Sequence, residues 1–395
     1  MTRNTLALIV VFSLIPLGPL AIDIYLPSMP EMQTAFGASE AEMRLTIPFY
    51  VYALGVAQLF GGPVSDRWGR LASATLGLGA YVAGSVAAAF APDLVWLYAA
   101  RILQGLGASF TMVTAFAWVR DNFEGDEAGK WLSYMSGLTG SVPMIAPVIG
   151  GVLAGIWGWQ ASFVMMALAV AIILALAPFT LRSDRSTVTD TAIDAERLTC
   201  NLRSLMSNRP FLVYSLANTT TFGALMAYVS IAPEVAMTRG GMDEMTFAFT
   251  LGGIGLLQMV FSFAAPVVVA RIGARRTVLT GLAMSVASGA GLLFVNETAT
   301  AAFFALAALG SGGFSLMIGI STGLTLQPFP HCAGLAASVG GFLRMFGGAL
   351  VATIVGLTDL TGPQMLALAL LVSMLPMVLI LFSTGLRIVV SDALK

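Results

Sequence analysis

The chain has 395 residues, of which 57% are hydrophobic and 10% are charged, and its mean hydropathy is +0.88. A soluble domain carries roughly 25% charged residues, and one as apolar as this chain would expose far more nonpolar surface than water tolerates. Nineteen Lys and Arg residues against twenty Asp and Glu residues give a net charge of −1, which provides no basic surface for nucleic acid. The composition predicts an all-α integral membrane protein that crosses the lipid bilayer many times.

Apolar stretches separated by polar breaks predict twelve transmembrane helices, each of about 20 residues. In chain order they cover residues 5–29, 42–63, 72–91, 94–117, 130–154, 160–180, 210–232, 245–269, 276–295, 299–322, 335–356 and 363–386. Of the 19 Lys and Arg residues, 15 fall on the same side as the N-terminus, two on the other side and two inside helices. Because Lys and Arg accumulate in cytoplasmic segments, both termini are predicted to be cytoplasmic.

One long charged segment divides the predicted helices into two groups of six. We predict an N-terminal six-helix bundle (residues 1–180), a cytoplasmic linker (181–209) and a C-terminal six-helix bundle (210–395). PVSDRWGR after the second span and PVVVARIGARR after the eighth place Gly69 and Gly273 204 positions apart, which indicates an internal repeat typical of transporters. The linker is either a solvated tether or a short helix on the membrane surface, with an apolar stripe of Ile193, Leu198, Leu202, Leu205 and Met206.

Signals of a soluble enzyme are absent from the sequence. The nearest approach to a phosphate-binding loop, Gly125 to Lys130, lacks the required spacing and the Ser or Thr. The single histidine, His331, has no carboxylate near it in the sequence. We therefore expect no enzymatic activity, no metal site and no bound cofactor.

Three charged residues lie inside the predicted helices. Asp23 is the only acid well inside a span; it is either a proton-carrying group in a cavity or a residue that reaches interfacial water. Arg101 either extends to the membrane surface or needs a partner, and Asp23 is the candidate because both residues fall in the outer half of their helices. Arg344 has no carboxylate of matching depth, so its partner is left open, and it is a further candidate gating residue.

Two segments contain candidate gating residues. The fifth span, SGLTGSVPMIAPVIGG, is either a kinked packing helix or a bent gate helix, with Pro143, Pro147, Gly150 and Gly151 as its gating residues. The predicted loop at 61–70 either anchors the cytoplasmic side or, through a carboxylate, ties helix ends together while the cytoplasmic mouth is closed. Its candidate residues are Gly62, Asp66, Arg67, Gly69 and Arg70.

A substrate cavity is expected between the two halves, lined by spans one, four, seven and ten. Asn218 and Phe222 are four positions apart and Phe314 and Met317 three apart, so each pair is predicted to share a helix face. Aromatic and thioether groups suit an adaptable apolar pocket, although each could instead face lipid or pack inside the protein. The candidate substrate-binding residues are Asp23, Tyr25, Met112, Asn218, Phe222, Phe314 and Met317.

These segments resemble the motifs of the major facilitator superfamily, and specifically its twelve-helix drug:proton antiporters. GPVSDRWGR resembles the signature between helices two and three, LYAARILQGLGA the fourth-helix signature R-x-x-Q-G, and GSVPMIAPVIGG the fifth-helix antiporter motif, although Ala146 stands where the family usually has Gly. Four further segments resemble the bicyclomycin/chloramphenicol-resistance branch of this superfamily: DIYLPSMP (23–30), Arg120-Asp121, FPHCAG (329–334) and the Arg344 region. Gln327 stands where an acid is expected before the FPH motif.

The resemblance implies a pump in the bacterial inner membrane that exports a small hydrophobic compound in exchange for protons by alternating access. Substrate specificity does not carry over from the family; an amphenicol-type antibiotic is one candidate, and we expect a monomer. Asp23 takes the family's first-helix acidic role with Arg101 beside it, and Asp66, Arg67 and Arg70 latch the cytoplasmic side. Protons are then the coupling ion, and no cofactor is implied. The alternatives are a proton-coupled or facilitative importer, or a sugar or metabolite exporter, of the same fold. A membrane-embedded enzyme or receptor is the third class.

Overall fold

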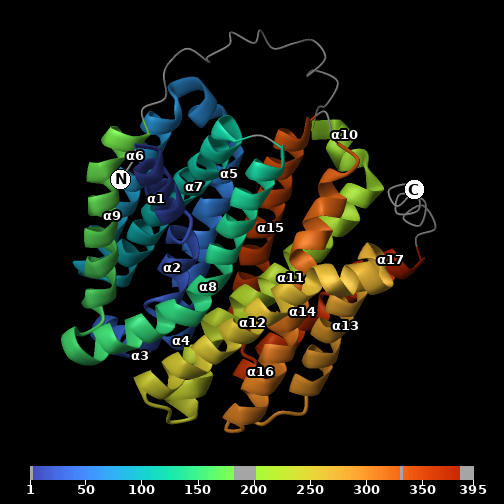
Figure 1. Cartoon of the computed structure of the whole chain (residues 1–395). Coiled ribbons are helices and arrows are strands. Elements are labelled where there is room, and N and C mark those ends of the chain that lie inside the picture. Colours follow the sequence, from blue (N-terminus) through green and yellow to red (C-terminus); the bar gives the residue numbers. More distant parts are fainter. Residues whose placement is uncertain (1–2, 124, 182–201, 330–331, 383–395) are drawn as a thin grey trace. The chain divides into compact units, whose positions relative to one another are not determined.

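The computed structural model describes residues 3–123, 125–181, 202–329 and 332–382, and within these ranges every regular element is a helix (Figure 1). In this part of the chain nine helices are long and apolar enough to cross a membrane, and a bent pair, Leu6–Leu14 with Leu17–Phe36, forms a tenth crossing. Two more long helices, α11 (Arg209–Pro233) and α13 (Ala274–Leu292), complete the twelve predicted spans. The all-α, twelve-helix membrane fold is therefore confirmed.

The chain divides into two compact units. The first contains the described residues up to 181 together with 241–256, and the second contains 202–240 and 257–382. Most of the predicted linker and His331 lie outside the described residues. The described end of the linker is α10 (Leu202–Ser207), in which Leu205 is buried whereas Leu202 and Met206 are exposed.

Prolines break the first span of the first unit into four short helices. Proline lacks a backbone N–H and obstructs the preceding turn, so it is favoured in the first turn of a helix and bends or breaks a helix further inside. Pro16 directly precedes α2, Pro27 lies in the first turn of η1, and Pro30 lies in the first turn of α3. Asp23 is therefore the last residue before an interruption. The four helices are α1 (Arg3–Leu14), α2 (Leu17–Asp23), η1 (Leu26–Ser28) and α3 (Met29–Phe36).

Among the other helices of the first unit, α5 and α6 both pack against α7, and α9 packs against α6. The prediction of a loop at 61–70 is wrong, because α5 continues to Trp68 with Pro63 inside it. Only Gly69, whose φ is 88°, separates α5 from α6, and this left-handed conformation favours glycine. These helices are α4 (Glu40–Arg44), α5 (Thr46–Trp68), α6 (Arg70–Ala89), α7 (Leu94–Asn122), α8 (Gly125–Trp157) and α9 (Gln160–Thr180).

In the second unit α11 is the most internal helix, since it packs against α14, α15 and α16 and most of its residues are buried. This position explains why α11 has Ser, Thr and Asn side chains within a span. Helix α12 is divided between the units at Leu256. The remaining elements are η4 (Glu234–Arg239), α12 (Glu244–Ile272), α14 (Thr300–Leu326), α15 (Ala333–Gly356), α16 (Gly362–Leu371) and α17 (Met374–Phe382).

The predicted internal repeat is present in the backbone. Gly69 before α6 has φ 88° and ψ 159°, and Gly273 before α13 has φ 84° and ψ 157°. The two connections therefore turn the chain in the same way. The helices that follow also pack alike. Helix α6 contacts the next helix, α7, and also α9; helix α13 likewise contacts the next helix, α14, and also α16.

A pair of facing glycines occurs in each unit as well. A Cβ atom on Gly77 of α6 would lie 2.9 Å from the carbonyl oxygen of Gly107 on α7. A Cβ atom on Gly281 of α13 would lie 2.6 Å from the carbonyl oxygen of Gly313 on α14. Glycine at these positions allows the two backbones to approach directly, which is a common way of packing helices in membranes.

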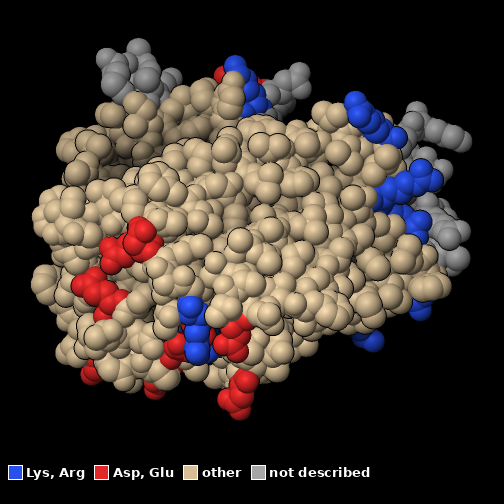
Figure 2. Space-filling model, turned by 90° about the horizontal axis from the view of Figure 1, so that it is seen from below, with Lys and Arg blue, Asp and Glu red and all other residues tan. Residues whose placement is uncertain are grey.

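Charged side chains occupy a small part of the surface that Figure 2 shows. They gather in a few groups near its edges, and broad areas between them carry neither Lys, Arg, Asp nor Glu. Many large apolar side chains are exposed, including Phe60, Ile172, Phe263 and Phe382. Such exposure suits lipid contact and is unusual for a protein in water.

Candidate functional site

Asp23 lies at the C-terminal end of α2, where the first span is interrupted. The residue is 7% exposed. Its carboxylate forms no ion pair or hydrogen bond with any residue that the structure describes. A buried carboxylate without a partner is costly as an anion, and this cost favours binding of a proton or a ligand. Asp23 thus has the surroundings of a group whose charge changes during function.

Arg101 of α7 is fully buried and lies between two tyrosine rings of the first unit. Its guanidinium carbon is 4.7 Å from the centre of the Tyr25 ring and 4.5 Å from that of Tyr50. Its Nη1 donates to the side-chain oxygen of Gln104 at 2.5 Å, and its Nε donates to the carbonyl oxygen of Thr46 at 3.5 Å. Among the described residues, none accepts a hydrogen bond from its Nη2.

The predicted pairing of Arg101 with Asp23 is therefore wrong for this structure. Gln104 lies one turn further along the same helix, so the guanidinium finds its acceptor locally. The Nε2 of Gln104 in turn donates to the hydroxyl oxygen of Ser85 on α6 at 2.8 Å. A Cβ atom on Gly105 would overlap the carbonyl oxygen of Tyr50, so glycine is needed where α7 meets α5. Gln104, Tyr25 and Tyr50 thus enclose the buried guanidinium group, and we call these residues the Arg101 clamp. The R-x-x-Q-G pattern supplies the Arg and Gln of this clamp.

Hydroxyl groups of three tyrosines hold the broken first span in place. Tyr50 donates to the carbonyl oxygen of Gly18 at 2.8 Å, and Tyr81 donates to that of Leu17 at 3.0 Å. The Tyr25 hydroxyl is 2.9 Å from that of Thr46. Tyr25, predicted to bind substrate, has no exposed surface and serves as one wall of the Arg101 clamp.

Helix α8 approaches the interruption in the first span through its glycines. A Cβ atom on Gly150 would overlap the carbonyl oxygen of Ile24, the residue after Asp23. A Cβ atom on Gly151 would lie 3.1 Å from the Cβ of Ala248 in α12, also within the first unit. The helix is continuous from Gly125 to Trp157, with the two candidate prolines inside it: Pro143 and Pro147.

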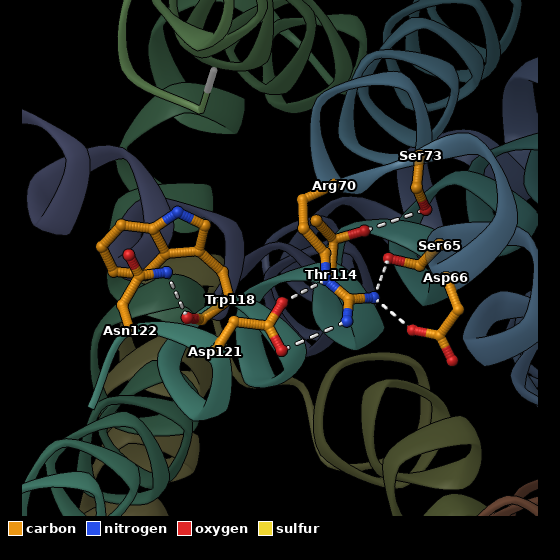
Figure 3. Close-up of polar contacts among 8 residues, drawn as sticks. All are labelled: Ser65, Asp66, Arg70, Ser73, Thr114, Trp118, Asp121 and Asn122. Carbon is orange, nitrogen blue, oxygen red and sulfur yellow. Dashed lines mark hydrogen bonds and ion pairs between the residues drawn. The ribbon is translucent and has the colours of Figure 1, made fainter. Parts of the chain in front are cut away.

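At the other end of the first unit, Arg70 joins three helices (Figure 3). Its Nε and Nη2 donate to the two carboxylate oxygens of Asp121 on α7 at 2.6 and 3.3 Å. Its Nη1 donates to Asp66 at 2.6 Å and to the hydroxyl oxygen of Ser65 at 2.8 Å, both on α5. Arg70 rather than Asp66 is the centre of this network. Arg67 is exposed and Gly62 is half-buried.

In the second unit the candidate residues separate into two groups. Phe222 of α11 and Phe314 of α14 are in contact, with ring centres 6.1 Å apart. Arg344 of α15 has its guanidinium carbon 6.0 Å from the centre of the Phe222 ring. Met317 instead packs in the core with Val278 and Leu282, so the prediction that it shares a pocket face with Phe314 is wrong. Asn218 belongs with Phe222 because it lies one turn before it on α11. The remaining candidate, Met112, lies in the first unit, where it is half-buried on α7.

The residues that sequence reasoning missed are mostly the partners of predicted ones. Gln104 was detectable, because it lies three positions after Arg101 and so on the same face. Asp121 stood in the quoted Arg120-Asp121 pair, but only the fold shows that it faces Arg70. Tyr50 gives no local signal, since it lies 51 residues before Arg101.

A model of the Major Facilitator Superfamily matches residues 11–352. The chain belongs to the Major Facilitator Superfamily. It is 30% identical over 386 residues to the multidrug resistance protein MdtL of Klebsiella pneumoniae, covering 96% of each chain. It is 31% identical over 353 residues to the MdtL of Shigella flexneri, covering 89% of each. As a major facilitator protein with these relatives, it is a multi-pass membrane transporter and not an enzyme.

Solved major facilitator structures share the fold. A D-xylose–proton symporter superposes with a TM-score of 0.79 at 14% identity, covering 95% of this chain and 97% of the symporter. A partially occluded, inward-open structure of the xylose transporter XylE from E. coli superposes with a TM-score of 0.77 at 12% identity, covering 97% and 98%. These similarities establish the major facilitator fold, and at such low identity they carry no conclusion about the substrate.

The clamp of this major facilitator protein predicts a strong effect of Gln104. Gln104→Leu removes the acceptor of a buried, charged donor, and such hydrogen bonds are worth about 1.5–3 kcal/mol. We expect transport to fall by at least about 10-fold, with a lower unfolding temperature of the purified protein. Ser85→Ala removes only a neutral hydrogen bond of Gln104 and should cost about 0.5–1.5 kcal/mol. Equal losses of transport in Gln104→Leu and Ser85→Ala would contradict the role of Gln104 as the acceptor for Arg101.

The Arg70 network predicts that Asp121 matters more than Asp66. The side chains of Asp66 and Asp121 are 70% and 46% exposed, and single exposed pairs are worth about 0–1 kcal/mol. Asp121 accepts two hydrogen bonds from one guanidinium, the stronger arrangement. Asp121→Asn should therefore reduce transport several-fold more than Asp66→Asn. Asp359→Asn, which alters an exposed acid of the second unit, is the matched control and should transport normally. A larger loss in Asp66→Asn than in Asp121→Asn would overturn this order.

Proposed function

We propose that this transporter exports small hydrophobic drugs across the bacterial inner membrane in exchange for protons, within the bicyclomycin/chloramphenicol-resistance branch. The observation that carries the proposal is Asp23, a buried carboxylate without a partner among the described residues, at the interruption of the first span. A proton and a substrate that bind to such a group in turn are coupled by competition. The names of the MdtL relatives, multidrug resistance proteins, support drug export as the direction.

The second element of the proposal is the Arg101 clamp in the same unit. Arg101 is held by Gln104 of its own helix and by the rings of Tyr25 and Tyr50, so its position does not depend on Asp23. Tyr25 follows Asp23 by two residues and its ring lies against Arg101. The clamp can therefore hold the interrupted first span at a constant position while the charge of Asp23 changes. Binding of a proton or a substrate to Asp23 then shifts the equilibrium between conformations of similar free energy.

The test is the sign of proton movement in vesicles that contain the purified protein and a pH-sensitive dye. Chloramphenicol, as a first probe, is added outside at equal internal and external pH. An antiporter carries protons out as the drug enters, so the interior becomes alkaline. A symporter would acidify the interior, and a facilitative carrier would leave its pH unchanged. Either of these two results with a transported probe would replace drug:proton antiport by the alternative, an importer or a metabolite carrier of the same fold.

A further inference from the structure

Arg344 is a partly buried charge within a span, and the proposed mechanism has no use for it. It lies halfway along α15, a helix that is apolar enough to cross a membrane. Its Nε is buried, and no residue that the structure describes accepts a hydrogen bond from its guanidinium group. The described contact of this group is the face of the Phe222 ring, 6.0 Å away.

No acid in the described part of the second unit is placed to neutralise Arg344. Glu234 lies at the start of η4 and is 3.8 Å from Arg239. Glu297 and Asp359 are exposed and lie in connections between helices. A charge inside a membrane span is normally paired, so a guanidinium group without an acid or another acceptor among the described residues is a vacant binding group.

A second polar group without a partner lies close by on α11. Asn218 is 5% exposed, and its side-chain oxygen is buried without a hydrogen bond to any described residue. It precedes Phe222 by one helical turn and so shares its face. Helices α11 and α15 are held together here, since the Thr219 hydroxyl donates to the Leu343 carbonyl oxygen at 3.0 Å. Buried amide groups are almost always bonded, so Asn218 points to a ligand as well.

Two aromatic rings complete the group. Phe222 and Phe314 have ring centres 6.1 Å apart and planes inclined by 48°. Aromatic rings provide apolar surface for a flat, apolar ligand. A guanidinium group has a planar array of N–H donors that matches a carboxylate. The same charge repels a cation. We propose that Arg344, Asn218, Phe222 and Phe314 form a substrate subsite for aromatic compounds with a carboxylate or similar anionic group. This proposal rests on the proposed function and adds anionic aromatic compounds to its hydrophobic drugs; such an anion binds at Arg344, because the Asp23 carboxylate would repel it.

Equilibrium binding to the purified full-length protein in a neutral detergent tests the subsite without any ion gradient. The probes are 2-naphthoate and (2-naphthyl)methylammonium, which share one fluorescent ring and carry opposite charges. Wild-type protein should bind the naphthoate roughly 10- to 150-fold more tightly than the ammonium compound, the ratio expected for a hydrogen bond to a charged group. Equal affinities, or a preference for the cation, would overturn the proposal.

Variants identify the residues responsible. Arg344→Gln should weaken naphthoate binding by roughly 10- to 150-fold and leave binding of the ammonium compound unchanged or tighter. The Nδ2 of Asn218 also has no partner among the described residues and can donate to a carboxylate. Asn218→Leu removes this donor and should weaken naphthoate binding by roughly 2- to 12-fold. Arg271→Gln removes the same charge from an exposed position on α12 and should change neither affinity. Arg344→Lys should restore part of the preference.

Three results would contradict the subsite: loss of both probes together in Arg344→Gln, unchanged naphthoate binding in that variant, or an equal effect of Arg271→Gln. The first would mean that Arg344 maintains the fold of α15 and does not select ligands. The preference for the anion and the direction of proton movement are separate readouts. Failure of antiport with the preference intact removes the proposed coupling and keeps the subsite, whereas antiport without the preference removes the subsite alone.

Discussion

Asp23→Asn is expected to abolish drug export against a gradient while the protein remains folded. Asparagine has nearly the same volume as aspartate and stays neutral, so it mimics the protonated carboxyl group without releasing a proton. Asp23 has no described hydrogen-bond partner that the change would leave unsatisfied, so stability should be preserved or improved. Export measured with an imposed pH gradient should fall to the level of empty vesicles.

Exchange of labelled for unlabelled drug at equal pH is the internal control for Asp23→Asn. This exchange needs no net proton movement, so it should continue in the variant and show that the drug still binds and that the protein still changes conformation. The variant should also no longer alter the internal pH when drug is added. An asparagine variant that still accumulates drug with an imposed pH gradient would exclude Asp23 from proton coupling.

Gly150→Ala is expected to have the second large effect. The added methyl group would overlap the carbonyl oxygen of Ile24, a backbone atom that cannot move aside as a flexible side chain can. Overpacking of this kind costs about 1–3 kcal/mol and occasionally more. It would also push α8 away from the interruption that follows Asp23. We expect a lower unfolding temperature of the purified protein and strongly reduced transport.

Gly137→Ala on the same helix is the matched control, because a Cβ atom there meets no other atom within 4 Å. Alanine has the higher helix propensity, so this variant should be as stable as the parent protein or more so. The two substitutions alter the sequence identically and differ only in what the new methyl group contacts. Normal transport by both variants would show that the close approach of α8 to Ile24 is not required.

The fold could be predicted from the sequence because span length and hydropathy are local properties. All twelve predicted spans contain helix, and the break at Gly69 was visible as a glycine in a polar stretch. The loop predicted around Gly69 is too long, since polar residues indicate a connection between helices equally well when they lie in a helix that extends beyond the membrane. Helix α5 carries polar residues to Trp68 because the span extends beyond its apolar part.

The candidate site was less accessible from the sequence, because its geometry depends on contacts between distant segments. Asp23 and Arg101 were found as buried charges, but pairing them by opposite charge overlooked Gln104, a neutral acceptor one turn away. Met317 fitted the spacing of a pocket residue, yet its side chain packs towards α13. Periodicity identifies residues on one helix and not the neighbour that each side chain meets.

The glycines at equivalent places in the two units bear on how this protein arose. Gly69 and Gly273 have the same backbone conformation, and Gly77 and Gly281 pack against a partner glycine in the same way. Duplication of an ancestral six-helix segment would preserve such positions, since any side chain there disturbs the backbone. The charged residues differ between the two copies: within its described spans the second copy has no acidic counterpart of Asp23. One ancestral bundle could thus become a proton-handling half and a half that selects its cargo.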